Sequence, residues 1–308
     1  MKILGIGNAI VDVLCRVDDE FLIKNSLIKS TMKLINEKEF KNLLTKLTIE
    51  ETISGGSIAN SIVGLSQLGN NVSFIGKVND DSFGQKYEDG LKKENVNYLY
   101  SKKREPISTG SCLILITPDS ERTMCTFLGT AGKINDQDIN ADDIKKAEII
   151  FLEGYLWDEG EPRKAFDKAI NNSNKVAMSL SDLFCVERHK NQFLELVKNK
   201  LDIVFANEQE ILSLINSQSF NEAITFSKNL NKNIVITRGD KGAVAINQGE
   251  VIECFAKKNL KITDLTGAGD LFAAGYLHGL INNMSTKESL SKGTELSSKI
   301  IQTIGARI

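Results

Sequence analysis

The sequence predicts an α/β fold in which one mostly parallel sheet is covered by helices on both faces. Two observations predict it. Short apolar runs, typical of buried strands, alternate with amphipathic helical patterns along most of the chain. The length of 308 residues, with 41% hydrophobic and 25% charged residues, suits a globular protein with one large domain. Two further segments break the alternation and predict a small additional β-sheet.

The expected strands are apolar runs bounded by polar or glycine-rich segments. They cover residues 2–6, 72–76, 111–117, 149–153, 175–179, 203–206, 234–237 and 243–247. The expected helices cover residues 57–68, 83–94, 162–171, 188–199, 208–214 and 220–229. In the first helix, Ile58, Ile62 and Leu65 recur at spacings of three and four residues and form one apolar stripe. Strand–helix–strand repetition favours a parallel sheet whose ligands bind beyond the carboxyl ends of the strands.

Residues 12–17 and 97–130 are the two segments that break the alternation, and both are rich in polar residues. We expect them to form a small sheet that projects from the main domain. A sheet in that position could close over a substrate as a lid and exclude water. The chain is therefore expected to be a single domain, residues 1–308, with this lid attached.

Charge and cysteine content narrow the classes of function. A net charge of −2 and scattered lysines do not favour nucleic-acid binding, which needs a clustered basic face. No window reaches the roughly 18 uninterrupted apolar residues that span a bilayer, and the first residues resemble a strand rather than a signal peptide. Five cysteines without paired spacing and only two histidines favour neither disulfides nor a zinc site. We therefore expect a cytoplasmic protein with reduced thiols.

The most informative segment is the loop from Asp264 to Asp270, which an apolar run follows at once. Gly267 and Gly269 open the expected helix, so their N–H groups and the helix dipole create a site for an anion. A carboxylate beside an anion repels it, unless the carboxylate takes a proton from the group that attacks the anion. The loop therefore suggests phosphoryl transfer to a hydroxyl group. The alternative is an ordinary helix N-terminus with an acidic residue that complements the dipole.

Two familiar nucleotide-binding motifs are not matched. Gly5 and Gly7 begin like a dinucleotide fingerprint, but Ile10 occupies the third glycine position. The Gly-Lys pair of a Walker A loop should precede Ser or Thr, and the two such pairs here precede Val78 and Ile134. A phosphate site must therefore use another loop.

Polar residues after the first expected strand and at the start of the first helix suit a pocket for hydroxyl groups. Asn8 and Asp12, four residues apart, could hold two adjacent hydroxyls, or they could belong to an ordinary turn. Gly55 and Gly56 would let a ligand approach the backbone, and Asn60 would face it from the first helical turn. The alternative there is a plain helix start with a serine N-cap.

Two later segments suit a nucleotide and its metal ion. Asn207 and Glu210, three residues apart after an apolar strand, could hold the waters of Mg²⁺, although a capping box explains the pair equally well. The segment from Thr237 through Gly239 to Gly242 offers a hydroxyl, glycines and two cations to a polyphosphate. An ordinary hairpin turn would have a similar sequence.

Taken in chain order, these segments resemble the ribokinase-like (PfkB) family of small-molecule kinases. The matching stretches are GNAIVDV, GGSIANSIVGLSQLG, FIGKVNDDSFG, FANEQE, ITRGDKG and DLTGAGDLFAAG, and the resemblance extends from Lys2 to Ala306. It implies a three-layer α/β/α domain with a small β-sheet lid. It also implies an enzyme that transfers a phosphoryl group from ATP to a hydroxymethyl group, by positioning and electrostatics.

The resemblance implies roles for the matching residues in the reaction. Asp270 would be the base that takes the proton of the acceptor hydroxyl. Gly267, Ala268 and Gly269 would offer N–H groups to the charge on the transferred phosphoryl group. The acceptor would be bound by Asp12, in a pocket completed by Asn8, Gly55, Gly56 and Asn60.

The resemblance also implies residues for ATP and Mg²⁺. Glu210, helped by Asn207, would organise Mg²⁺. Thr237 and Gly239, with Gly242 in the same loop, would contact the ATP phosphates.

Asp264 and Thr266 match positions that coordinate a monovalent cation such as K⁺ in many family members. This chain has Leu265 where the family commonly has Thr, a departure that concerns the expected cation loop and not the expected base. Members occur as monomers and as dimers formed through the small sheet, so a monomer or a homodimer is expected.

Within the family, the chain is similar to bacterial adenosine kinases, in the stretches FLEGYLWD, LSDLFCVERHK and DLTGAGDLFAAGYLHGL. Tyr155, with Phe127 as a second candidate, could stack on the purine, for about 1–3 kcal/mol. The alternative is that Tyr155 packs at the edge of the sheet. Arg122 could steady a phosphate group or the lid, or it could be an ordinary residue of a surface turn.

Three hypotheses about function follow. The first is an ATP-dependent adenosine kinase, and the second is a kinase of a free sugar such as ribose or fructose, with the same catalytic parts. The third is a non-catalytic ligand-binding protein. The presence of Asp270 and of the glycines before it weighs against the third.

Overall fold

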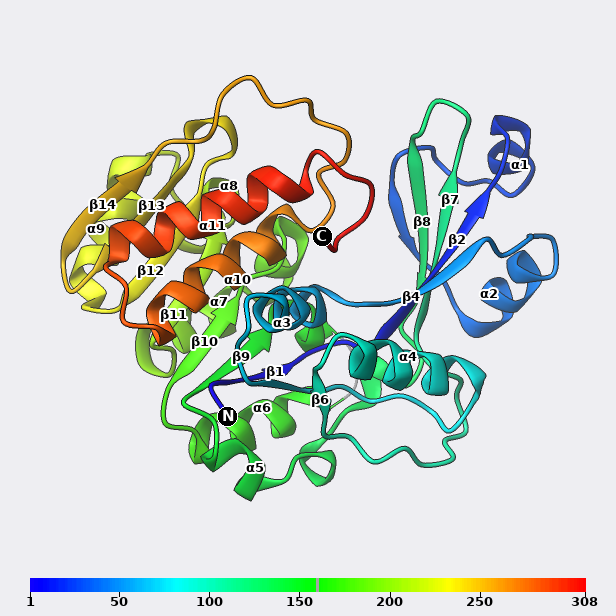
Figure 1. Cartoon of the computed structure of the whole chain (residues 1–308), viewed down its shortest axis with the longest axis horizontal. Helices are drawn as coiled ribbons and strands as arrows, with labels where there is room; N and C mark the ends of the chain where they lie inside the picture. The colour runs from blue at the N-terminus through cyan, green and yellow to red at the C-terminus, as the bar shows by residue number, and fades with distance from the viewer. Residues whose placement is uncertain (159–160) are drawn as a thin grey trace.

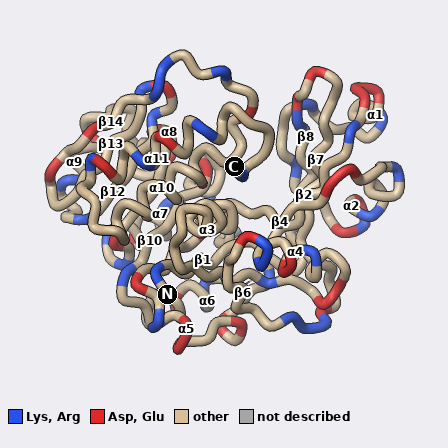
Figure 2. The backbone as a smooth tube through the Cα atoms, in the orientation of Figure 1, with Lys and Arg blue, Asp and Glu red and all other residues tan. Residues whose placement is uncertain are grey.

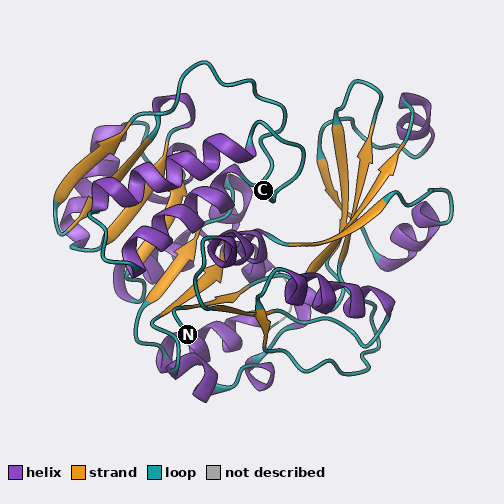
Figure 3. Cartoon of the chain, in the orientation of Figure 1, coloured by secondary structure: helices purple, strands orange, loops and turns teal. Residues whose placement is uncertain are grey.

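The computed structural model describes residues 1–158 and 161–308. Within this part of the chain, the strands form one sheet of nine strands and one of five (Figure 1). The larger sheet lies between helices, and the smaller sheet projects from this body on the right of the view (Figure 3). The predicted α/β fold with a small additional sheet is confirmed.

The large sheet is mostly parallel. Its strands, in spatial order, are β14 (Glu250–Cys254), β13 (Ala243–Asn247), β12 (Asn233–Thr237), β11 (Ile203–Asn207), β10 (Val176–Ser179), β9 (Ile149–Glu153), β1 (Ile3–Ile6), β5 (Val72–Ile75) and β6 (Asn97–Tyr98). The neighbours from β12 to β6 pair in parallel, and β13 pairs antiparallel with both β12 and β14. The chain order reverses at β1, between β9 and β5, and sheets of this kind bind ligands at such a reversal.

Helices cover both faces of this sheet. On one face lie α3 (Ser57–Gln67), α4 (Ser82–Lys93), α10 (Ala268–Ile281) and α11 (Thr286–Ile300), and on the other lie α5 (Ala141–Lys145), α6 (Pro162–Asn172), α7 (Leu183–Asn199), α8 (Glu208–Ile215) and α9 (Phe220–Leu230). Ile3 packs with the first set and Leu4 with the second, because successive residues of a strand point to opposite faces. The result is the predicted three-layer arrangement.

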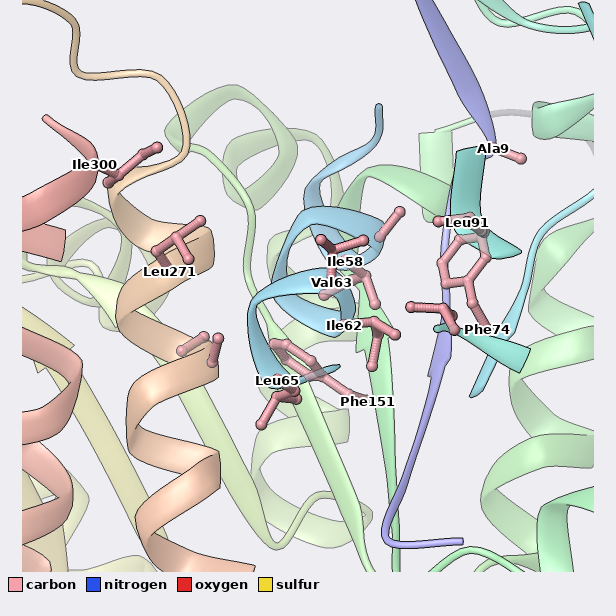
Figure 4. Close-up of a cluster of buried hydrophobic side chains, with 14 of the residues drawn as sticks. Ala9, Ile58, Ile62, Val63, Leu65, Phe74, Leu91, Phe151, Leu271 and Ile300 are labelled. Atoms are coloured by element: carbon pink, nitrogen blue, oxygen red, sulfur yellow. The ribbon is translucent and has the colours of Figure 1, made fainter. Parts of the chain in front are cut away.

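Helix α3 lies between the large sheet and α10 (Figure 4). Its residues Ile58 and Ile62 are fully buried in the core. A Cβ atom on Gly64 would lie 2.8 Å from Leu271 and 3.1 Å from Ala274, so this glycine allows α3 and α10 to pack closely. The close packing brings the N-termini of the two helices together.

The five strands of the small sheet are, in spatial order, β3 (Met32–Leu34), β8 (Arg122–Phe127), β7 (Ser111–Ile116), β2 (Ile10–Arg16) and β4 (Glu51–Gly55). One face is covered by α1 (Asp19–Lys24) and α2 (Glu37–Leu44), through buried Leu22, Phe40 and Leu43. Residues 7–9 alone connect β1 to β2, so the chain passes there from the large sheet into the small one.

Several expected boundaries differ from the structure. The strand expected at 111–117 forms β7 of the small sheet, between β2 and β8. Residues 97–98, expected within the lid segment, pair with β5 as the edge strand β6 of the large sheet. The small sheet also contains β3 and β4, which have no clear sequence pattern because β3 is exposed at every residue and β4 is exposed at its first. Helix α7 begins before residue 188, because the Asp182 side chain caps Leu183–Asn199.

Charged residues of both signs are interspersed along the chain (Figure 2). Among the helices that the structure describes, none is long and apolar enough to cross a membrane.

Candidate active site

Asp270, the base expected from the sequence, lies in the first turn of α10 against the N-terminus of α3. Ser57 Oγ donates a hydrogen bond to Asp270 Oδ1 (2.6 Å), and Asn60 Nδ2 donates to Oδ2 (3.0 Å). Burial raises the pKa of Asp270 to about 6, although both hydrogen bonds and the positive charge of Arg307 act to lower it. A carboxylate with this pKa is mostly ionised at pH 7 and can accept a proton.

Gly267, Ala268 and Gly269 form the start of α10 beside Asp270. Gly267 has a φ of 76°, in the left-handed region that favours glycine. A Cβ atom on Gly269 would have no heavy atom within 4 Å, so the turn is open on this side. The turn lines a cavity of about 420 Å³. The Ala268 N–H donates to Leu265 O (3.2 Å). The N–H groups of Gly267 and Gly269, together with the helix dipole, make this wall suitable for an anion such as a phosphoryl group.

The lining of the cavity also includes Asn207 and Glu210, where β11 meets α8. Asn207 Nδ2 donates to Glu210 Oε1 (2.6 Å), and the main-chain N–H of Glu210 donates to Asn207 Oδ1 (2.8 Å). The capping box considered from the sequence is therefore present. Burial raises the pKa of Glu210 to about 7, and the nearby Asp182 raises it further.

The Asn207–Glu210 pair fits the expected Mg²⁺, because a cation would stabilise a buried carboxylate that has a second acid beside it. Within the described residues, no group of three or more His, Cys, Asp or Glu side chains is placed to hold a metal ion. Mg²⁺ often keeps several waters and binds through one or two carboxylates and substrate phosphates. Such a site needs no larger cluster of protein ligands.

Of the expected phosphate loop, Thr237 lines the cavity, whereas Gly239 and Gly242 shape a tight turn after β12. The main-chain N–H of Arg238 donates to Gly242 O (2.8 Å). The Arg238 side chain donates to Glu208 (2.9 Å) and is therefore not free to meet a phosphate.

Asp264 begins the loop that leads to Asp270, and four donors surround its carboxylate. Thr266 donates through its main-chain N–H (2.9 Å) and its Oγ1 (2.7 Å), Gly305 donates its N–H (2.8 Å), and Arg122 forms an ion pair (3.0 Å). Burial alone would raise the pKa of Asp264, but these partners hold it below its usual value. These donors already occupy the carboxylate. The Asp264 and Thr266 side chains are therefore better suited to anchor the C-terminal segment, as a clamp, than to coordinate K⁺.

Asp12 lies on β2 of the small sheet, beside Gly55 at the end of β4. A Cβ atom on Gly55 would lie 2.3 Å from Asp12 Oδ2, so the glycine leaves room for this carboxylate. Burial raises the pKa of Asp12 to about 7, while the charges of Arg307 and Arg122 lower it. The expected hydroxyl-binding carboxylate therefore lies within the electrostatic reach of two arginines.

Asn8 follows β1 and is held by Glu153, the last residue of β9. Asn8 Nδ2 donates to Glu153 Oε1 (2.8 Å), and the main-chain N–H groups of Asn8 and Ile58 donate to Oε2 (3.3 and 3.2 Å). The Asn8 Oδ1 atom is buried and has no hydrogen-bond partner in the described residues. It is therefore available to a ligand hydroxyl. Gly56 caps α3 next to the main-chain oxygen of Asn8.

Tyr155 lies on the wall of the cavity that also contains Asn207 and Thr237, and Asp12 does not line this cavity. The main-chain N–H of Tyr155 donates to Ser181 Oγ (3.1 Å). Tyr155 is therefore fixed at the cavity that Asp270 also lines.

Three residues of the site were not anticipated from the sequence: Ser57, Glu153 and Arg307. Ser57 was considered as an N-cap, and only the packing of α3 on α10 shows that it donates to Asp270. Glu153 could have been found from the sequence, because an acidic residue that ends an apolar strand lies at the edge of the sheet where ligands bind. Arg307 had none, because it lies in a short segment without a regular pattern after the last helix.

Comparisons with known proteins agree with this geometry. A family model described as pfkB family carbohydrate kinase matches residues 24–308. The crystal structure of adenosine kinase from Sinorhizobium meliloti is 34% identical, with a TM-score of 0.90, and the match covers 100% of this chain and 95% of that one. A probable sugar kinase protein from Rhizobium etli CFN 42 is also 34% identical, with a TM-score of 0.89 and coverage of 99% and 94%. Adenosine kinase 2 of Arabidopsis thaliana is 26% identical over 98% of this chain and 94% of its own length.

Proposed function

Because the chain belongs to the pfkB family of carbohydrate kinases, we propose that it transfers a phosphoryl group from ATP to the hydroxymethyl group of adenosine, giving AMP and ADP. The observation that carries the reaction type is the Asp270 carboxylate, which has a pKa of about 6 and lies at the open N-terminal turn of α10. The choice of adenosine is supported by the chain's similarity to adenosine kinases over nearly its whole length.

Asp270 takes the proton of the acceptor hydroxyl as the oxygen attacks the terminal phosphoryl group. Ser57 and Asn60 hold both oxygens of this carboxylate, so its position is set before substrate binds. The N–H groups of Gly267 and Gly269 stabilise the charge of the transferred group. Catalysis by these residues is positioning and electrostatics, as phosphoryl transfer requires.

ATP binds along the cavity wall formed by Thr237, Asn207 and Glu210. Mg²⁺, held near Glu210 through water, neutralises charge on the phosphates when it is bound. Tyr155 lines the same cavity as these residues and Asp270, and its stacking on the acceptor purine stays a prediction.

The inner face of the small sheet supports a nucleoside as the acceptor. Asp12 and Leu14 of β2 lie on this face, and strand pairing places Ile114 beside Leu14 and Met124 beside Ile114. These apolar side chains form a cluster separate from the outer core of that sheet. A carboxylate next to an apolar surface suits a ribose joined to a planar base.

A free sugar is the second candidate. Asn8, Asp12 and Asn60 would serve a sugar as well as a ribose, and the similarity to a probable sugar kinase favours keeping it. A sugar, however, would leave the apolar face of the small sheet without a partner.

The test is ADP release from Mg-ATP in the presence of a panel of nucleosides and free sugars. We expect adenosine to give the highest kcat/KM. Release with ribose or fructose alone would favour the sugar kinase, and no release with any acceptor would favour a non-catalytic binding protein.

A second measurement tests the apolar face. Met124→Gln should raise KM for adenosine by roughly 5–30-fold, because about 1–2 kcal/mol of apolar contact is lost. Met284→Gln, at a residue that is 40% exposed after α10, is the matched control and should leave KM unchanged. An unchanged KM in Met124→Gln would remove the support that this face gives to a nucleoside.

A further inference from the structure

The chain ends between the body and the small sheet (Figure 1), and Arg307 lies in this last segment. Arg307 Nε donates a hydrogen bond to Asn60 Oδ1 (3.2 Å), and Asn60 Nδ2 donates to Asp270 Oδ2 (3.0 Å). The segment is anchored two residues earlier, because the Gly305 N–H donates to Asp264. A continuous chain of hydrogen bonds therefore joins the C-terminal segment to the carboxylate of Asp270.

Arg307 and Asp270 together fix which way the Asn60 amide faces. An amide has one end that accepts hydrogen bonds and one that donates them. The guanidinium group requires the oxygen on its side, which leaves the NH₂ group for Asp270. The reverse orientation would set NH₂ against a cation and oxygen against a carboxylate, and both contacts would be repulsive. Without Arg307, the amide would lose the contact at its oxygen end, and Asn60 would be held less firmly against Asp270.

Arg307 also carries the positive charge of an acidic region. Asp12, Glu153 and Tyr155 all interact electrostatically with Asp270 as acidic groups. Arg307 interacts with both Asp12 and Asp270, and desolvation of its guanidinium shows that it is largely removed from water. Its Nη2 atom is buried without a hydrogen-bond partner in the described residues.

We propose that Arg307 is a positioning residue of the reaction, which orients Asp270 through the amide of Asn60 and balances the charges of Asp12 and Asp270. This inference rests on the proposed function for its kinetic consequences but not for its electrostatic ones. The two are therefore tested separately.

The kinetic test compares Arg307→Met, Arg307→Lys and the control Arg104→Met, which removes an exposed arginine of the loop between β6 and β7. Each is assayed for kcat and KM with adenosine and Mg-ATP across pH 5–9. We expect kcat of Arg307→Met to fall on the order of 100-fold, because the base is no longer held in place. The pH at which kcat of Arg307→Met falls on the acidic side should move to a higher value, because loss of the cation favours protonated Asp270.

Arg307→Lys separates the two roles. Lysine keeps the charge but cannot reproduce the guanidinium contact with Asn60, so kcat should fall while the acidic limb stays near that of the wild type. Arg104→Met should change neither quantity. An Arg307→Met profile whose acidic limb stays in place would overturn the inference, even if kcat falls, because a purely structural residue would give that result.

The electrostatic test needs no turnover. Asp12 and Asp270 have folded-state pKa values above those of the unfolded chain, so their protonation favours folding and this stability is lost as pH rises through the folded-state values. Loss of Arg307 raises these values further. The difference in Tm between wild type and Arg307→Met should therefore be larger at pH 8 than at pH 5. An equal difference at both pH values would overturn the inference, whereas an inactive wild type would overturn only the proposed function.

Discussion

Asp264 and Asp270 stand six residues apart in one loop, and their surroundings give them opposite properties. Asp264 is surrounded by donors from Thr266, Gly305 and Arg122, which hold its pKa below its usual value. Asp270 receives two donors, and burial raises its pKa to about 6. We therefore propose that the same residue type serves once to anchor the C-terminal segment and once as a base, and that the number of donors and the desolvation of each carboxylate decide which.

The strongest test of this contrast is Asp270→Asn, which keeps the shape of the side chain and removes its basicity. We expect kcat to fall about 10²–10⁴-fold, the range for loss of a general base. Adenosine binding, measured by calorimetry, should stay within a few-fold of the wild type. A variant that keeps most of its kcat would show that another group takes the proton.

The pH dependence of kcat/KM should report the ionisation of Asp270, the proposed base, and not that of Asp264. Asp270 must be ionised to act as a base. Below the apparent pKa of the acidic limb, kcat/KM should therefore fall about tenfold per pH unit. Because Asp12 and Glu153 have pKa values of about 7 and interact with Asp270, we expect the limb between pH 6 and 7. An acidic limb below pH 5 would contradict the burial of Asp270.

Asp264→Asn should mainly lower stability. We expect the free energy of unfolding to fall by about 1–3 kcal/mol, because donors lose an ionised acceptor, while kcat stays within about tenfold. The folded-state pKa of Asp264 is depressed, so its contribution is present above the unfolded value and is lost as pH falls through the folded value.

Urea unfolding of wild type and Asp264→Asn at pH 7 and pH 3 therefore measures how much the ionised Asp264 adds to stability. The difference in the free energy of unfolding between the two proteins should be larger at pH 7. The contrast between the two aspartates fails if this variant loses as much kcat as Asp270→Asn while its stability is unchanged.

Arg122→Met should have the smallest effect. It removes the ion pair that joins the small sheet to Asp264, and both side chains are about one-tenth exposed. We expect a loss of about 1 kcal/mol in the free energy of unfolding. Arg16→Met is the control from the same sheet, because Arg16 is 70% exposed and pairs with Glu50 at the surface. Equal losses in the two variants would mean that the ion pair adds nothing beyond a surface contact.

The sequence predicted those parts of the fold and site that are encoded locally. The apolar patterns at residues 57–68 and 149–153 reflect burial in the cores on the two faces of the large sheet, so they were visible without coordinates. The loop from Asp264 to Asp270 was visible because its glycines and carboxylate act within one turn. Strand β3 was not, since its side chains are exposed and carry no apolar pattern.

Contacts between distant segments could not be predicted in this way. Arg307 and Asn60 are separated by most of the chain, and their contact exists because the last segment folds back over α3. Tyr155 was identified from its aromatic ring, but the wall on which it lies depends on how β9 ends in the sheet. The resemblance to a family supplied the roles of residues that local patterns left open.

The short connection between β1 and β2 has a consequence for how ATP is protected from water. Asp12 belongs to the small sheet, and Asp270 belongs to the body. Under the proposed roles, an acceptor hydroxyl is held both by Asp12 and by Asp270. A water molecule at Asp270 has no contact with Asp12, so hydrolysis of ATP in the absence of acceptor should remain slow. We propose that the division of one site between two sheets couples ATP cleavage to the presence of the correct alcohol.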